Sequence, residues 1–163
     1  MFKIGDKIVY PMHGAGIVKA IEEKEVLGEK HMYYVMKLKD MQVMLPIRSD
    51  VGVREIVDLT TLEDVIESLQ EEGVTSKLNA TQRQRVNLNK IKSGDIHQVA
   101  EVIRDLAHLA KKRTLSTGDK NILDNARQIF LSELVLVKNV TPEEATEILD
   151  EALNEAQDEA IGC

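Results

Sequence analysis

The first forty residues constrain the fold more than any other part of the chain. A Gly-Asp turn precedes a short strand over 7–10, and a Pro-Met-His-Gly-Ala-Gly corner leads into a long alternating strand over 15–26. Pro11 removes one donor from a strand ladder, while Gly14 and Gly16 allow positive φ or a close approach of two backbones. Strands bent this sharply favour a small, strongly curved β-barrel. Such barrels usually dock on a partner, so a binding module is the first hypothesis.

Three further strands are predicted in the first domain, which we expect to span residues 1–59. They lie at 31–38, 41–46 and 52–57, and polar and apolar residues alternate most clearly in the first two of them. Five short strands at this spacing fit a small barrel or a curved sheet.

The pattern becomes helical after residue 59, and a second domain is expected over 60–160. Apolar residues recur there at helical spacing, which predicts a compact bundle of about five α-helices. Residues 71–79 are expected to form a loop after the first helix, with Gly73 as the stop signal. The helix starts are predicted from five capping residues, Thr60, Asn79, Asp95, Ser116 and Thr141. The predicted fold class is therefore α+β, a five-stranded barrel followed by helices.

Residues with catalytic or metal-binding chemistry are sparse. The four histidines are scattered and lack the paired spacing of a metal-binding helix, and no glycine-rich loop precedes a phosphate-binding helix. We therefore expect neither an enzyme nor a cofactor. The single cysteine, Cys163, excludes an internal disulfide, and every apolar run falls far short of the roughly 20 residues that span a bilayer. A cytoplasmic protein without membrane contact is predicted.

The charged residues are distributed unevenly along the chain. The net charge is −7, but residues 76–138 carry twelve basic and six acidic side chains. Residues 139–163 carry eight acidic side chains and no basic one. A basic block between acidic flanks indicates a local site for a polyanion, although a solvated helical face explains the same charges.

Within the basic block, individual positions differ in what they indicate. Arg83 and Arg85 lie two positions apart on a predicted helix and point in different directions, and Lys90 extends the cationic surface. Lys120 falls in the first turn of a helix, where a cation opposes the helix dipole, so an external phosphate explains it better. Residues 111–113 end a helix, where cations favour the dipole, and a structural role suffices for them.

Six segments of the chain carry a further signal because they occur in a recognisable order. They are FKIGDKIVYPMHGAGIV at the start, VGVREIV at 51–57, NLNKIKSGD at 87–95, VAEVIRDL at 99–106, LSTGDKNILDNARQIFLSEL at 115–134 and TEILDEAL at 146–153. From Phe2 to about Ala156 the chain resembles the CarD/CdnL family of bacterial RNA polymerase-binding transcription regulators.

The resemblance implies a Tudor-like or SH3-like barrel that binds the RNA polymerase β subunit, and a helical domain that reaches promoter DNA. Family members contact the upstream edge of the transcription bubble and stabilise the open complex. The barrel contact combines strand-edge pairing with side chains, and the matching positions here are Lys24, Val26, Met44 and Leu45. Met44 stands where some members carry Arg, so part of this contact is expected to be apolar.

The DNA-contacting part departs from the family at one position. The family's wedge is a Trp just after the Asn that opens the second helix, whereas here Ala80 follows Asn79 and the chain has no Trp. Base stacking is worth about 1–3 kcal/mol per base. We therefore expect weaker bubble stabilisation, or use of Leu78 as a smaller apolar wedge. The expected DNA-binding residues are Leu78, Asn79, Ala80, Arg83, Arg85, Lys90 and Lys120.

Two functions remain open from the sequence. The first is a transcription regulator that holds weak, non-sequence-specific DNA contacts in place by tethering them to polymerase, which supplies a high local concentration. The second is a protein-binding adaptor on polymerase without direct DNA contact. A monomer is the default expectation, although an exposed strand edge can pair two chains.

Overall fold

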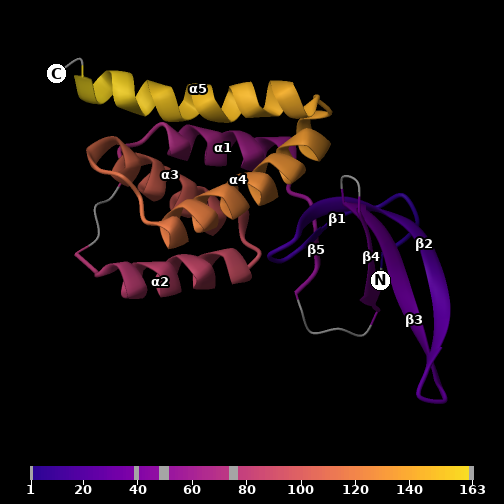
Figure 1. The fold of residues 1–163 in the computed structure, drawn as a ribbon. Coiled ribbons are helices and arrows are strands. Elements are labelled where there is room, and N and C mark those ends of the chain that lie inside the picture. Colours follow the sequence, from indigo (N-terminus) through magenta and orange to yellow (C-terminus); the bar gives the residue numbers. More distant parts are fainter. Residues whose placement is uncertain (1, 39–40, 48–51, 74–76, 162–163) are drawn as a thin grey trace.

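The computed structural model describes residues 2–38, 41–47, 52–73 and 77–161, and it consists of an antiparallel sheet followed by helices (Figure 1). In the described residues the sheet has the order β4-β3-β2-β1-β5, so β4 and β5 are its edges. This agrees with the predicted α+β class. The strands are β1 (Lys7–Tyr10), β2 (Gly14–Val26), β3 (Glu29–Leu38), β4 (Met41–Pro46) and β5 (Arg54–Glu55).

The glycine corner between β1 and β2 has the tight geometry that its sequence predicts. Gly14 has a φ of +111°, and a Cβ at Gly16 would lie 2.3 Å from the carbonyl oxygen of Lys37. A shift in register between Val18 and Ala20 adds further twist to β2. The sheet therefore curls around one apolar face, whose buried side chains are Ile8, Val18, Tyr34, Met36, Leu38 and Leu45.

Five helices follow in the described part of the chain, and four of their predicted caps are confirmed. Asn79, Asp95 and Ser116 each accept a hydrogen bond from a backbone N–H of the first turn, and Thr141 accepts one from Glu144 N at 3.1 Å. The helices are α1 (Leu59–Leu69), α2 (Ala80–Lys92), α3 (Ile96–Lys112), α4 (Thr117–Lys138) and α5 (Pro142–Ile161).

The predicted start of the first helix is wrong, whereas its end agrees with the loop predicted to begin at residue 71. Asp58, not Thr60, is the N-cap of α1, because its carboxylate accepts the Thr61 N–H at 2.7 Å and Thr60 already lies in the first turn. The helix ends at Leu69, before Gly73. Gly73 also serves a packing role, since a Cβ there would lie 2.4 Å from the Cβ of His108. The predicted strand at 52–57 is likewise reduced to the two residues of β5.

The helices share a second apolar core, separate from that of the sheet. It contains large aliphatic side chains from α1, α3, α4 and α5 together with Phe130. The fully buried members include Leu62, Leu69, Ile103, Leu106, Phe130, Leu134 and Leu149. Within the described residues, none of the helices combines the length and apolar character needed to cross a bilayer.

One buried carboxylate connects the two parts of the molecule, and we call its contacts the Glu133 junction. Glu133 of α4 is 2% exposed and forms two hydrogen bonds of 2.8 Å with the Arg54 guanidinium of β5. Its Oε2 also accepts the Val57 N–H at 2.9 Å. Beside it, the Ala15 N–H donates to Ser132 Oγ at 2.8 Å. The sheet and the helices are therefore joined by buried polar contacts and not only by the connecting chain.

Candidate functional site

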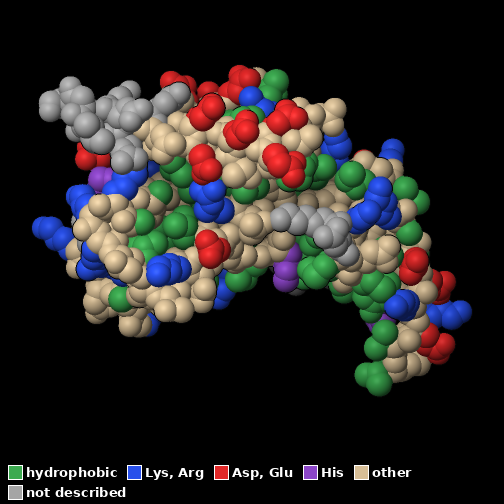
Figure 2. Space-filling view, turned by 45° about the horizontal axis from the view of Figure 1, so that its top comes forward, with side chains coloured by type: hydrophobic (Ala, Val, Ile, Leu, Met, Phe, Trp, Pro, Cys, Tyr) green, Lys and Arg blue, Asp and Glu red, His purple; other side chains and the backbone are tan. Residues whose placement is uncertain are grey.

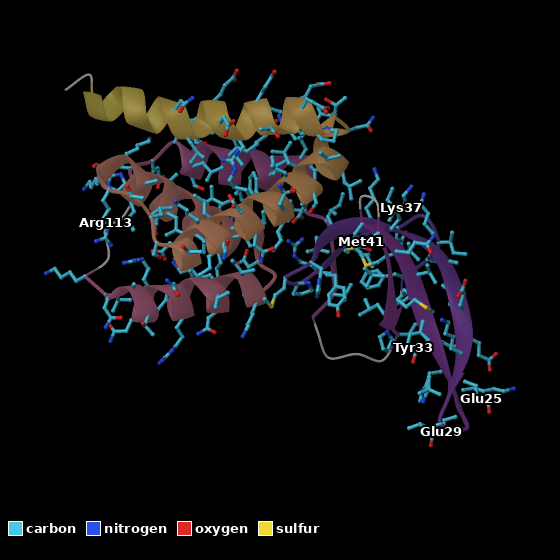
Figure 3. All side chains as sticks on the ribbon, in the orientation of Figure 1. Glu25, Glu29, Tyr33, Lys37, Met41 and Arg113 are labelled. Atoms are coloured by element: carbon cyan, nitrogen blue, oxygen red, sulfur yellow. The ribbon has the colours of Figure 1, made fainter. Side chains whose placement is uncertain are left out.

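The hairpin formed by β2 and β3 projects away from the helices, with Glu25 and Glu29 near its end (Figure 3). Lys24 is exposed on this hairpin and lies opposite His31 in the register. Val26 is 44% exposed, and Leu27 at the turn is 99% exposed with a φ of +53°. The structure thus places Lys24 and Val26 on an accessible arm that carries apolar and cationic groups together.

The edge strand β4 presents the other residues expected to bind polymerase. It pairs with β3 in the described sheet, and Met44 lies opposite Val35 with its side chain half-buried. Leu45 lies opposite Tyr34 and is 1% exposed, because side chains alternate between the two faces of a strand. The Leu45 side chain therefore belongs to the core of the sheet, and only its backbone is placed to take part in the predicted strand-edge contact.

The start of α2 exposes residues that the sequence analysis expects to contact DNA. Asn79 and Gln82 form a reciprocal capping box, with Gln82 N donating to Asn79 Oδ1 at 2.9 Å and Asn79 N donating to Gln82 Oε1 at 3.2 Å. Ala80 is exposed and Leu78 is 40% exposed. Asn79 is thus occupied as a cap, and Leu78 is the largest apolar side chain at this point of the surface.

Arg83 has a structural partner, and this changes its expected role. Its Nη2 donates to Asp119 Oδ2 at 2.6 Å, and Arg83 is 9% and Asp119 1% exposed. Ser116 Oγ, the cap of α4, also donates to Asp119 Oδ2 at 3.0 Å. Because the guanidinium is buried and paired, the prediction that Arg83 binds a DNA phosphate loses its support.

The pKa of Asp119 reflects the same surroundings. Burial alone would raise it, but hydrogen bonds from Arg83 and Ser116, together with the positive charges of Arg83 and Arg113, lower it below its ordinary range. The carboxylate therefore stays ionised and holds α2 against the start of α4.

The remaining cations of the predicted DNA surface are not equivalent. Arg85 and Lys120 are exposed, and neither side chain forms an ion pair with a described residue. Lys90 is less available, because its Nζ lies 3.0 Å from Glu101 Oε2. Figure 2 shows Lys and Arg side chains on the helical part away from the sheet, whereas acidic side chains cover α5. Arg85 and Lys120 are therefore the two predicted phosphate ligands that the structure leaves accessible.

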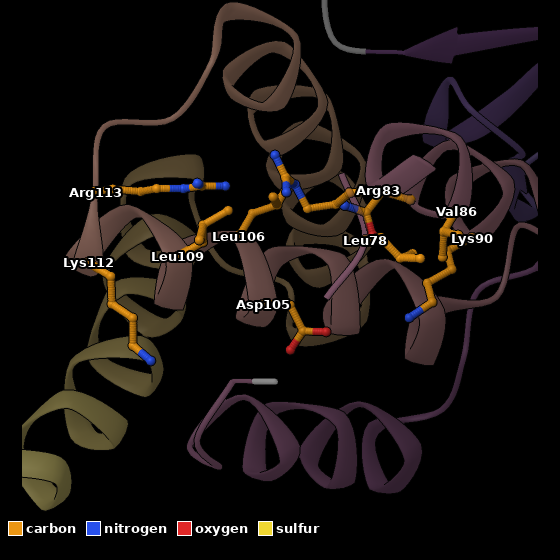
Figure 4. A pocket seen from close by; sticks show the side chains of 10 residues that line it. Leu78, Arg83, Val86, Lys90, Asp105, Leu106, Leu109, Lys112 and Arg113 are labelled. Carbon is orange, nitrogen blue, oxygen red and sulfur yellow. The ribbon is translucent and has the colours of Figure 1, made fainter. Parts of the chain in front are cut away.

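A cavity of about 520 Å³ lies between α2 and the C-terminal half of α3 (Figure 4), and we call it the α2–α3 pocket. Its apolar wall consists of Leu78, Val86, Leu106 and Leu109. Its charged lining consists of Arg83, Lys90, Asp105, Lys112 and Arg113. No pattern in the sequence predicts this pocket, since the end of a helix is enough to explain Lys112 and Arg113.

Comparison with known proteins agrees with this architecture. Residues 2–57 match the CarD-like/TRCF RID domain, and residues 64–150 match the CarD C-terminal domain. The chain is also 43% identical over 145 residues to the "Putative transcription factor YdeB" of Bacillus subtilis strain 168, covering 86% of this chain and 95% of the relative. The chain therefore belongs to the CarD family of transcription regulators.

Family membership settles the class of the protein. It is a non-enzymatic transcription regulator, as the sequence predicts, and its RID domain implies an interaction with RNA polymerase.

Proposed function

We propose that the sheet binds the β subunit of RNA polymerase and that the helices contact promoter DNA at the upstream edge of the transcription bubble, stabilising the open complex. The observation that carries this proposal is the Glu133 junction, which connects a polymerase-interacting domain to helices with the accessible cations Arg85 and Lys120. A DNA site held next to polymerase needs little affinity of its own, because tethering raises its local concentration. This reconciles a net-negative chain with a DNA contact.

The polymerase contact is tested with the variant Lys24→Glu. We expect a loss of at least ten-fold in affinity for the isolated β subunit, because the reversed charge stands on the exposed hairpin beside Val26. The measurement is surface-based binding of the full chain to the β subunit. Lys19→Glu is the matched control, since Lys19 is exposed on the same strand but lies nearer the helices. Equal affinity of both variants and wild type would exclude this hairpin as the contact.

The DNA contact is tested with the double variant Arg85→Gln and Lys120→Gln. We expect a shorter open-complex lifetime and a salt dependence of promoter binding whose logarithmic slope is smaller by about 2, because each phosphate contact contributes roughly 0.9. The stability of the free protein should not fall, since Lys120 lies in the first turn of α4, where a cation is unfavourable.

Lys138→Gln, in the last turn of the same helix, is the control for general loss of charge. Reconstituted polymerase on a linear promoter gives both the lifetime and the salt slope. An unchanged slope for the double variant would favour the adaptor without DNA contact.

A further inference from the structure

We propose that the α2–α3 pocket binds one unstacked nucleotide, with the base against its apolar wall and the phosphate at its basic rim. Where that nucleotide belongs to a DNA strand, the inference rests on the function proposed above. The pocket volume of about 520 Å³ lies within the range of roughly 300–1,000 Å³ typical of small-molecule sites.

The apolar wall is suited to a flat ring. Val86 is 41% and Leu78 40% exposed, although both are aliphatic and both line a concave surface. Leu106 and Leu109 of α3 close the other side of the pocket. Enzymes and readers that take a base out of its stack hold it between apolar or aromatic side chains, so an aliphatic cleft of this kind is a suitable receptor.

The rim carries an excess of positive charge at one end. Arg83 and Lys90 are neutralised by Asp119 and Glu101, but the exposed Arg113 guanidinium makes no ion pair in the part of the chain that the structure describes. Figure 4 shows the Arg113 side chain extending above Leu109 toward Arg83. The carboxylate of the lining, Asp105, is paired with Arg104, so a phosphate at the rim would supply the counter-charge of Arg113.

The position of the pocket favours a nucleotide over an acidic peptide. Leu78 belongs to the pocket, precedes the Asn79 cap and is 40% exposed, so a flat base can reach it from solvent. An apolar wall joined to a single cationic rim matches a base with its own phosphate, whereas repeated carboxylates of a peptide would leave the apolar wall uncovered. The same chemistry is offered by a base from a melted strand and by a free nucleotide.

The test is an NMR titration of the full ¹⁵N-labelled chain with dAMP at millimolar concentration. We expect saturable shifts of the backbone amides of Val86, Leu109 and Arg113. Val86→Phe should weaken binding at least ten-fold, because the larger side chain fills the pocket from a partly exposed position. Leu59→Phe on α1, where Leu59 is 49% exposed, is the matched control and should bind like wild type.

Separate probes test the base site and the phosphate site. Arg113→Gln should weaken dAMP binding about five-fold and leave binding of deoxyadenosine unchanged, because only dAMP carries the phosphate. Inorganic phosphate should bind much more weakly than dAMP. If phosphate or an oligoglutamate peptide produces the same shifts with the same affinity as dAMP, or if Val86→Phe binds dAMP normally, the proposal is overturned. The absence of any shift with dAMP overturns it as well.

A third arm identifies the source of the nucleotide. Tighter binding of the single-stranded trinucleotide d(TAT) than of dAMP supports a base from a DNA strand, whereas equal affinity supports a free nucleotide. These titrations contain no polymerase and no promoter. The absence of dAMP binding therefore contradicts the nucleotide site alone. An unchanged salt slope for the Arg85 and Lys120 double variant contradicts the proposed DNA contact alone.

Discussion

Replacing Glu133 by Ala is expected to lower the free energy of unfolding by about 3–5 kcal/mol, as is usual when one partner of a buried ion pair is removed. The carboxylate is 2% exposed, and its loss removes the counter-charge of Arg54 and the acceptor of the Val57 N–H, while Arg54 keeps its hydrogen bonds to the Gly94 and Glu55 carbonyl oxygens. Chemical denaturation followed by circular dichroism gives the change. Glu147→Ala, at an exposed position on α5, is the control and should change stability by no more than about 0.5 kcal/mol.

The same variant also separates the two proposed activities. The polymerase contact should survive in Glu133→Ala, because the hairpin lies far from the junction (Figure 1). Open-complex stabilisation should fall, because the helices are no longer held in place against the sheet. Unchanged stability together with an unchanged open-complex lifetime would contradict the claim that the Glu133 junction holds the helices against the sheet.

Replacing Asp119 by Ala is the second change for which a large effect is expected, again about 3–5 kcal/mol of unfolding free energy. It leaves Arg83 buried without a counter-charge and removes the acceptor of the Ser116 hydroxyl. Denaturant unfolding is again the measurement. Asp124→Ala, at an exposed position on the same helix, is the matched control. A loss for Asp119→Ala no larger than that for Asp124→Ala would contradict the structural role assigned to Asp119.

The pair can then be removed as a whole to decide what Arg83 does. The double variant Arg83→Met and Asp119→Leu should regain most or all of the lost stability, because apolar residues of similar volume often replace a buried ion pair without cost. If Arg83 is purely structural, this variant also retains open-complex stabilisation. If the double variant is stable but no longer stabilises the open complex, Arg83 contributes to DNA binding.

The Arg83–Asp119 pair also predicts a dependence of stability on pH. The pKa of Asp119 is lowered in the folded state, so its contribution is fully present above the ordinary Asp pKa of about 4 and is lost as the pH falls through the lower folded value. The difference in unfolding free energy between wild type and Asp119→Asn should therefore shrink under acid conditions. A difference that is constant or grows on acidification would contradict this assignment.

The features that could be predicted from the sequence are those set by near neighbours. The glycine corner, four helix caps and the strands with alternating polar and apolar residues depend on residues a few positions apart. These predictions are confirmed. The burial of Leu45 follows from the same alternation and could have been predicted from it. The N-cap of α1 was misplaced because Thr60 and Glu63 have capping-box spacing, yet Asp58 supplies the acceptor.

The features that could not be predicted depend on partners far along the chain. In the sequence Arg83 is indistinguishable from a surface cation, because its partner Asp119 lies 36 positions away. Arg54 and Glu133 are 79 positions apart, so no local sequence pattern predicts the Glu133 junction. The α2–α3 pocket is lined by residues of two helices, and the positions of Val86 and Arg113 in it follow only from the packing of those helices.

The glycine corner has a consequence for how such a regulator can change over evolution. A Cβ at Gly14 would lie 2.7 Å from Ser132 Oγ, so the corner of the sheet lies directly against the Ser132 side chain of α4 and has no room for a side chain of its own. The distance between the sheet and α4 is therefore set by this contact and not by the length of the connecting chain. Loops can lengthen or change in sequence without altering that spacing. A single methyl group at Gly14, by contrast, would push the sheet and α4 apart and shift the polymerase-binding surface relative to the helices.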